Sequence, residues 1–195
     1  MKFTTKYIGL DVSKEKIAVA IAEEGREAPR YYGTIEHSPA GLRKLIKNLS
    51  DENTRLSFCY EAGPTGYETY RWIKNMGAEC TIIAPSLIPK RAGDRVKTDR
   101  RDAEQLARLF RAGELSEVYV PTREHEALRD LVRMRESAKE DEHRARQRIL
   151  KFLLRHQIHP PLTIKRNWTK KHRTWLKKLT FDHEALQITL TEMIH

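Results

Sequence analysis

The order of its short apolar segments constrains this chain more than any other feature. Three strand-like segments come first, at residues 7–13, 16–24 and 30–36, and the second follows the first closely enough to be its hairpin partner. Helix and strand patterns then alternate, with a helix at 38–50, a strand at 55–62, a helix at 67–76 and a strand at 78–84. The sequence therefore predicts an α/β domain with a mixed sheet flanked by helices.

Longer and more polar segments follow the last predicted strand. A basic loop at residues 85–97 leads into a helix from Asp99 to Ala112, and a long charged helix is expected at residues 123–156 with a thin apolar seam. We expect residues 1–120 to form the α/β domain and residues 121–195 a basic helical, coiled-coil extension. The final helix pattern runs to His195 without a closing cap, so we expect the extension to lead to a further domain.

Charge separates the two halves of the chain. Residues 1–88 hold 12 lysines and arginines against 11 aspartates and glutamates, whereas residues 89–195 hold 25 against 16, within a total net charge of +10. A regional excess of this kind suits DNA or RNA, whose affinity for proteins comes largely from phosphate contacts. No signal peptide, membrane-length apolar run or zinc-type cysteine spacing is present, which predicts a cytoplasmic protein without a membrane partner.

Four carboxylates stand near the ends of predicted elements. Asp11 lies in the first strand on the face of Tyr7 and Gly9, and Glu61 ends the fourth strand. Asp99 and Asp102 are one helical turn apart and share a face. Ribonuclease-H-like nucleases assemble a metal site in this way, from a strand with its hairpin partner, a later strand end and a later helix. Carboxylates suit Mg²⁺, or Mn²⁺ in its place, which predicts a site for cleaving phosphodiesters.

Basic residues surround the last two acids. They cannot ligate a metal, but they can hold phosphates beside one. The residues predicted to bind nucleic acid are Lys90, Arg91, Arg95, Lys97, Arg100 and Arg101.

Several of these stretches resemble a known family. The segments "GLDVSKEKIAVAI", "YEAGPTGYETYRWI", "PSLIPKRAGDRVKTDRRDAEQLARLFRAGELSEVYVP" and "EHEALRDLVRMRESAKEDEHRARQRILKFLLRH" resemble the DEDD transposases of bacterial insertion sequences, the insertion-sequence one-ten family, which includes Piv-type invertases. The resemblance implies a RuvC-like, ribonuclease-H-like N-terminal domain. It also implies that the family's acidic tetrad corresponds here to Asp11, Glu61, Asp99 and Asp102, as catalytic residues and ligands of Mg²⁺.

The resemblance implies partners as well. Members of the family recombine donor and target DNA under the guidance of a structured non-coding RNA. Because the long helix has a thin seam, we also expect a homo-oligomer, a dimer or tetramer, and we expect the protein to associate with the nucleoid. A second domain, expected beyond His195, supplies a nucleophilic serine. The resemblance therefore predicts the N-terminal portion of an RNA-guided DNA transposase or recombinase, incomplete for the full reaction.

Three other functions remain open from the residues. An actin-like ATPase would share the opening strand and hairpin, but "EAGPTG" is its one candidate phosphate loop. A Holliday-junction nuclease would share the metal chemistry and leave the long helix unexplained. A non-catalytic RNA- and DNA-binding module would use aromatic stacking by Trp168, Trp175 and Tyr119.

Overall fold

The chain divides into two compact units, Met1–Val120 and Pro121–His195. The computed structural model describes residues 4–89 and 98–194 of them. The first unit contains strands β1 (Thr4–Val12), β2 (Lys16–Glu23), β3 (Arg30–Glu36), β4 (Thr54–Glu61) and β5 (Glu79–Ile83), helices α1 (Pro39–Leu49), α2 (Glu68–Asn75) and α3 (Asp99–Ala112), and the 3-10 turn η1 (Pro85–Leu87). The second unit contains α4 (Arg123–Arg155), α5 (Lys170–Lys178) and α6 (Glu184–Ile194).

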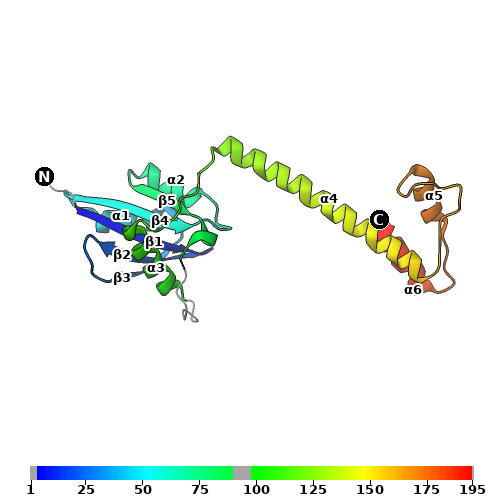
Figure 1. Cartoon of the computed structure of the whole chain (residues 1–195), viewed down its shortest axis with the longest axis horizontal. Coiled ribbons are helices and arrows are strands. Elements are labelled where there is room, and N and C mark those ends of the chain that lie inside the picture. The colour runs from blue at the N-terminus through cyan, green and yellow to red at the C-terminus, as the bar shows by residue number, and fades with distance from the viewer. Residues whose placement is uncertain (1–3, 90–97, 195) are drawn as a thin grey trace. The chain divides into compact units, whose positions relative to one another are not determined.

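The first unit is built on a mixed five-stranded sheet with the order β3-β2-β1-β4-β5 (Figure 1). The opening strands β1, β2 and β3 pair antiparallel, and β4 and β5 join the sheet parallel to β1. The predicted α/β sheet with flanking helices and a long helical extension is confirmed, and it is a ribonuclease-H-like arrangement. That the extension pairs as a coiled coil stays a prediction.

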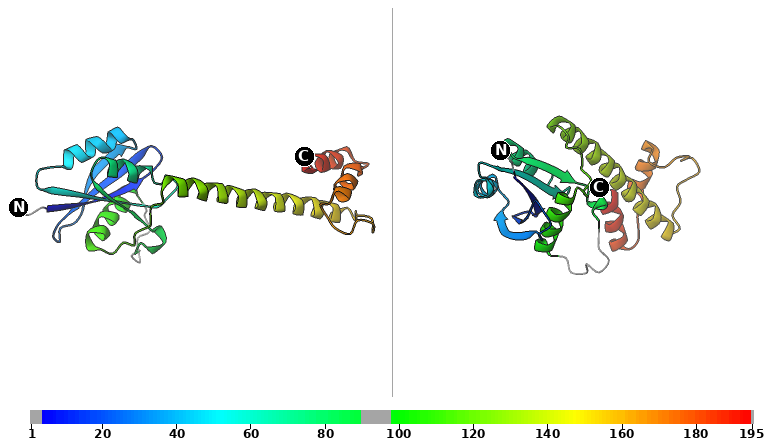
Figure 2. Two further views of the ribbon diagram at one scale, coloured as in Figure 1. Left: turned by 90° about the horizontal axis from the view of Figure 1, so that it is seen from above. Right: turned by 60° about the vertical axis from the view of Figure 1, so that its left-hand side comes forward.

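The two faces of the sheet carry different side chains. Ile8 and Leu10 of β1 point to one face, where they pack with Leu42 of α1 and Ile73 of α2 in the main apolar cluster. Alanines of β2 point to the other face and pack against α3. Figure 2 shows α1 and α3 on opposite sides of the strands. The alternation along each strand thus assigns α1 and α2 to one layer and α3 to the other.

The close approach of α3 depends on small residues beneath it. A Cβ atom at Gly9 would lie 2.5 Å from the amide nitrogen of Ala107 and closer still to the carbonyl oxygen of Ala103. Thr98 caps the helix by accepting a hydrogen bond from the Arg101 amide (3.3 Å), and Gly113 ends it with φ of 70°. The sequence predicted both helix bounds, because capping and termination are local.

The second unit has its own small core. Ile149, Phe152 and Leu153 of α4 are buried with Leu176 of α5 and Leu190 of α6. Trp168 and Trp175 pack against this cluster, which accounts for the two tryptophans without stacked bases. Residues 123–144 of α4 are exposed apart from Glu126, which is half-buried, and no residue among them is buried.

The apolar residues of α4 differ in burial between the two ends of the helix. Its C-terminal members lie inside the core, whereas Leu128 and Leu131 are 58 % and 67 % exposed. The C-terminal part of the seam therefore belongs to the core of the second unit, and the N-terminal part is exposed. No helix in the described part of the chain is both long enough and apolar enough to cross a bilayer.

Candidate active site

Strands β1 and β4 place two of the four acids side by side. Their parallel register pairs Gly9 with Cys59 and Leu10 with Tyr60. One step further along both strands come Asp11 and Glu61, the latter being the last residue of β4. Because residues two apart on a strand share a face, Asp11 lies on the face of Gly9 and Glu61 on that of Cys59. Both Gly9 and Cys59 face α3, since each contacts Leu106.

Helix α3 runs antiparallel to β1 across this face. Near its C-terminal end, Phe110 meets Tyr7 edge-on, with ring centroids 5.7 Å apart. In its middle, the backbone at Ala103 and Ala107 covers Gly9. Continuing in the same direction brings the first turn of α3 to the level of Asp11. The N-terminal end of α3 and the C-terminal ends of β1 and β4 therefore meet at one edge of the sheet.

The first turn of α3 supplies the other two acids. Asp99 lies one turn before Ala103, which is buried against the sheet. Asp102 lies one turn before Leu106, which packs with Cys59 of β4 and Ile83 of β5. Asp102 thus stands on the β4 side of the helix, where Glu61 ends its strand. The structure brings all four predicted acids to one face at one edge.

The four side chains are not gathered into a tight cluster. Asp11 and Asp102 are half-buried, whereas Glu61 and Asp99 are exposed. Among residues 4–89 and 98–194, no group of three or more histidine, cysteine or carboxylate side chains stands close enough to hold a metal ion. In donor chemistry the set fits Mg²⁺, because all its ligand atoms are carboxylate oxygens.

The described basic residues flank this edge. The Arg100 guanidinium lies over the ring of Tyr31, 5.4 Å from its centroid, and its Nε donates to Glu104 Oε1 at 2.9 Å. Arg100 and Arg101 are both exposed at the head of α3. The predicted residues Lys90, Arg91, Arg95 and Lys97 lie outside the described residues.

Two supporting residues were not found from the sequence. Tyr31 belongs to β3, and its hydroxyl is hydrogen-bonded to that of Thr34 at 2.7 Å. Gln105 of α3 donates to the carbonyl oxygen of Pro89 at 2.8 Å, at the start of the basic loop. The contacts of Tyr31 with Arg100 and of Gln105 with Pro89 have no local sequence signal, because each joins residues that are 16 or more positions apart. Only the sheet register and the seat of α3 reveal them.

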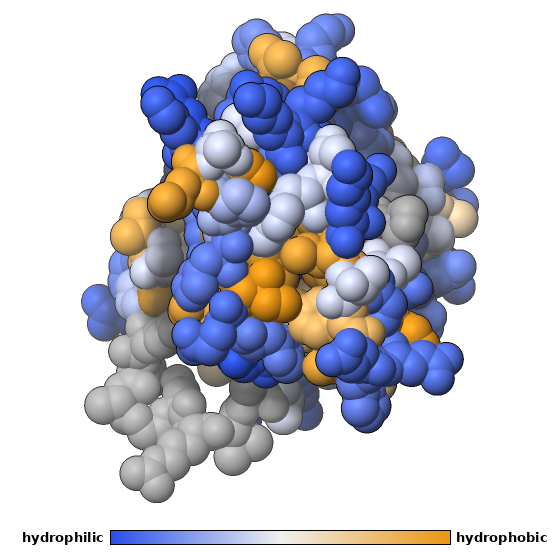
Figure 3. Space-filling model, turned by 90° about the vertical axis from the view of Figure 1, so that its right-hand side faces the viewer, coloured by the Kyte–Doolittle hydropathy of each residue, from blue (hydrophilic) through white to orange (hydrophobic). Residues whose placement is uncertain are grey.

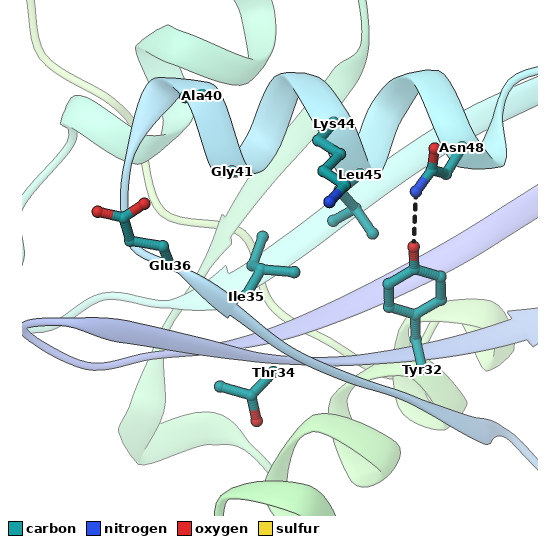
Figure 4. A pocket seen from close by; sticks show the side chains of 9 residues that line it. All are labelled: Tyr32, Thr34, Ile35, Glu36, Ala40, Gly41, Lys44, Leu45 and Asn48. Atoms are coloured by element: carbon teal, nitrogen blue, oxygen red, sulfur yellow. Dashed lines mark hydrogen bonds between the residues drawn. The ribbon is translucent and has the colours of Figure 1, made fainter.

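A separate hollow of about 440 Å³ lies between α1 and the edge strand β3 (Figure 4). Tyr32 and Ile35 point from β3 toward α1, and Asn48 Nδ2 of α1 donates to the Tyr32 hydroxyl at 3.2 Å. Helix α1 covers the face opposite α3, so this hollow is not the site of the four acids. None of the predicted site residues lines it.

Comparison with known proteins adds independent information. Residues 8–159 match the family of DEDD transposases of the IS110 type, whose description is "Transposase". The chain is 52% identical over 190 residues to "Putative transposase y4qE" of Sinorhizobium fredii, covering 96% of this chain and 48% of that protein. It is 41% identical over 187 residues to "Transposase for insertion sequence element IS1533" of Leptospira borgpetersenii, covering 95% of this chain and 54% of that protein. The chain thus spans about half the length of these relatives.

Proposed function

The chain belongs to the DEDD transposases of the IS110 family, and we propose that it is the part that acts on DNA phosphodiesters through a magnesium site made by Asp11, Glu61, Asp99 and Asp102. The reaction proposed is site-specific insertion-sequence transposition. The first unit would supply the carboxylate domain and the second unit the helical extension. Residues beyond this chain would supply the remainder of the reaction.

One observation carries the proposal. The register of β1 with β4 and the antiparallel seat of α3 bring acids from three separate elements to one edge and one face of the sheet. Capping alone explains an acid in the first turn of α3, since the helix dipole favours it. Capping does not explain why Asp11 and Glu61 lie at the C-terminal ends of neighbouring strands, Asp11 one residue before the end of β1 and Glu61 at the end of β4.

The carboxylates would hold the cation through their oxygens. When bound, Mg²⁺ or Mn²⁺ polarises a phosphodiester and offsets the negative charge that develops on its oxygens. Asp11 and Asp102 are half-buried and start from restricted positions, whereas the exposed Glu61 and Asp99 can turn toward the ion. The residues present thus fit a cation that assembles its own ligand shell.

The basic residues at the head of α3 would bind the DNA backbone. Guanidinium groups match phosphate oxygens in paired hydrogen bonds. The position of the Arg100 guanidinium is restrained by its contact with the Tyr31 ring and by its hydrogen bond to Glu104. Lys90, Arg91, Arg95, Lys97 and Arg101 are proposed to extend the same surface.

Further partners belong to the whole protein. By family membership we propose donor and target DNA, a structured guide RNA, a homo-oligomer, and action at the nucleoid in the cytoplasm. The attacking serine is proposed to come from a second domain that this chain does not contain. Within the chain, water would then be the remaining nucleophile, without groups arranged to position it.

A nicking assay tests the proposal. Labelled donor and target DNA are incubated with the chain in Mg²⁺ or Mn²⁺, with and without the element's own RNA. We expect at most weak nicking, lost in Asp11→Asn and in Asp102→Asn and kept in the control Asp51→Asn, an exposed acid outside the site. Complete strand exchange by residues 1–195 alone would refute the division of the reaction between two domains.

A further inference from the structure

We propose that a groove beside α4 and α6 in the second unit is a binding site for a single DNA strand, with the phosphates held by Arg148, Lys151 and Arg155. The α4–α6 groove has a volume of about 780 Å³. Its apolar part includes Leu154 of α4 and Met193 of α6, and its basic part comes from α4. The inference rests on the family's action on DNA and does not depend on the carboxylate site.

The basic side chains form a regular row. Arg144, Arg148, Lys151 and Arg155 all line the groove, at spacings of four, three and four residues. Such spacings place side chains on one face of an α-helix. With a rise of 1.5 Å per residue, the row extends over about 16 Å. A polyanion lying along the helix could therefore contact several of these cations at once.

Most of the row has no anionic partner within the protein. Arg144 is paired with Asp141 at 2.6 Å and with Glu140 at 3.7 Å. Arg148, Lys151 and Arg155 are exposed and form no ion pair in the part of the chain that the structure describes. No aspartate or glutamate lines the groove. Three neighbouring cations repel one another, so a bound anion would relieve that repulsion.

An adjoining hollow has an acidic lining residue. It shares Arg148 and Met193 with the groove and is also lined by Glu192 of α6. Glu192 opposes the binding of an anion near Arg148. The phosphate at Arg148 is therefore expected to bind more weakly than those at Lys151 and Arg155.

The shape and chemistry of the groove favour a nucleic-acid strand. Guanidinium groups predominate in the row, and they match phosphate oxygens in paired contacts. The apolar part can receive a base, which an unpaired strand offers and a duplex keeps stacked in its interior. A pocket of this size accommodates a group of about drug size, such as a nucleotide. Figure 3 shows apolar patches interspersed with hydrophilic side chains on the face that it presents.

The test is a binding titration of the full chain in EDTA, with a 12-nucleotide single DNA strand, an RNA strand of the same sequence, and the DNA duplex. The triple variant Arg148→Ala, Lys151→Ala, Arg155→Ala is compared with Arg133→Ala, Arg135→Ala, Lys139→Ala. The control residues are equally exposed, lie on the same helix and are outside the groove.

We expect the groove variant to bind the single DNA strand at least tenfold more weakly. Its slope of log affinity against log salt should fall by roughly 2, as loss of three single-strand phosphate contacts requires. The control triple variant should change affinity less than threefold, and Glu192→Gln should strengthen binding. The inference is overturned by equal losses in the two triple variants, by a duplex that loses as much affinity as the strand, by tighter binding of RNA, or by preferential binding of an oligoglutamate peptide. Because no metal is present, metal-dependent binding at the carboxylate site does not contribute to this result.

Discussion

Gly9 is the residue on which the seat of α3 depends. A methyl group there would overlap the helix backbone at Ala103 and Ala107. We expect Gly9→Ala to destabilise the chain by about 1–3 kcal/mol or more, because overpacking forces the helix away from the sheet. Urea unfolding measures the change.

Gly63 provides the matched control for Gly9. A Cβ atom at Gly63 would have ordinary contacts only, the nearest at 3.9 Å to the Glu61 carbonyl oxygen. Gly63→Ala should therefore leave the unfolding midpoint nearly unchanged. A Gly9→Ala protein as stable as the parent would mean that α3 is not seated as described.

His172 makes the stability of the second unit depend on pH. Its ring is fully buried between Trp168 and Trp175, with centroids 5.3 Å from each, and neither ring nitrogen has a hydrogen-bond partner among residues 4–89 and 98–194. Burial lowers the pKa of His172 below its ordinary value. The unfolded chain then binds a proton more readily than the folded one. Stability is complete above the ordinary histidine pKa of about 6.5 and declines as the pH falls below it.

Replacement of this ring tests the pH dependence. We expect His172→Phe to melt with less loss of thermal stability between pH 7.5 and pH 5.5 than the parent, as followed by circular dichroism. His159→Gln, which removes an exposed histidine, should keep the parent's loss. The same loss in the parent and in His172→Phe would assign the acid sensitivity to other groups.

At the scale of elements, the N-terminal part of α4 exposes apolar residues that nothing in the described structure covers. Leu128, Leu131 and Val132 are 58 %, 67 % and 45 % exposed, and Ala138 and Ala145 continue Leu131 at intervals of seven residues. A helix with so thin a seam gains little stability in isolation. A heptad spacing is typical of pairing between helices. We propose that this segment pairs with a second copy of the chain.

Sedimentation measures this association. We expect the parent chain to be a dimer or larger at micromolar concentration, and Leu128→Glu with Leu131→Glu to be a monomer. Leu162→Glu, which changes a leucine that is 99 % exposed, should associate as the parent does. A monomeric parent would remove the pairing proposal.

The sequence predicted elements better than their surroundings. The strands, the bounds of α3 and the face of Asp11 follow from local periodicity and capping, so they could be read directly. The sequence could not predict which apolar residues of α4 are buried, because burial of Ile149 and Phe152 depends on packing with α5 and α6. Likewise, the contact of Arg100 with Tyr31 could not be predicted, because it depends on the place of β3 in the sheet, next to β2.

At the scale of the whole molecule, the first unit carries the edge with the four carboxylates and the second unit is helical and basic. The two parts have separable tests, because metal binding depends on the acids and strand binding in EDTA does not. The acids at the edge were predicted by type and by element. Their joint position required the sheet register, which the sequence alone did not provide.

The central claim is that Asp11, Glu61, Asp99 and Asp102 form one cation site, and thermal unfolding in a Mg²⁺ titration tests it most directly. A ligand at 100 times its dissociation constant stabilises the folded state by about 2.7 kcal/mol. The parent chain and the control Asp51→Asn should therefore show a rising melting temperature that depends on Mg²⁺ concentration. Asp11→Asn with Asp102→Asn should show none. An equal rise in the double variant, or no rise in the parent, would contradict the account.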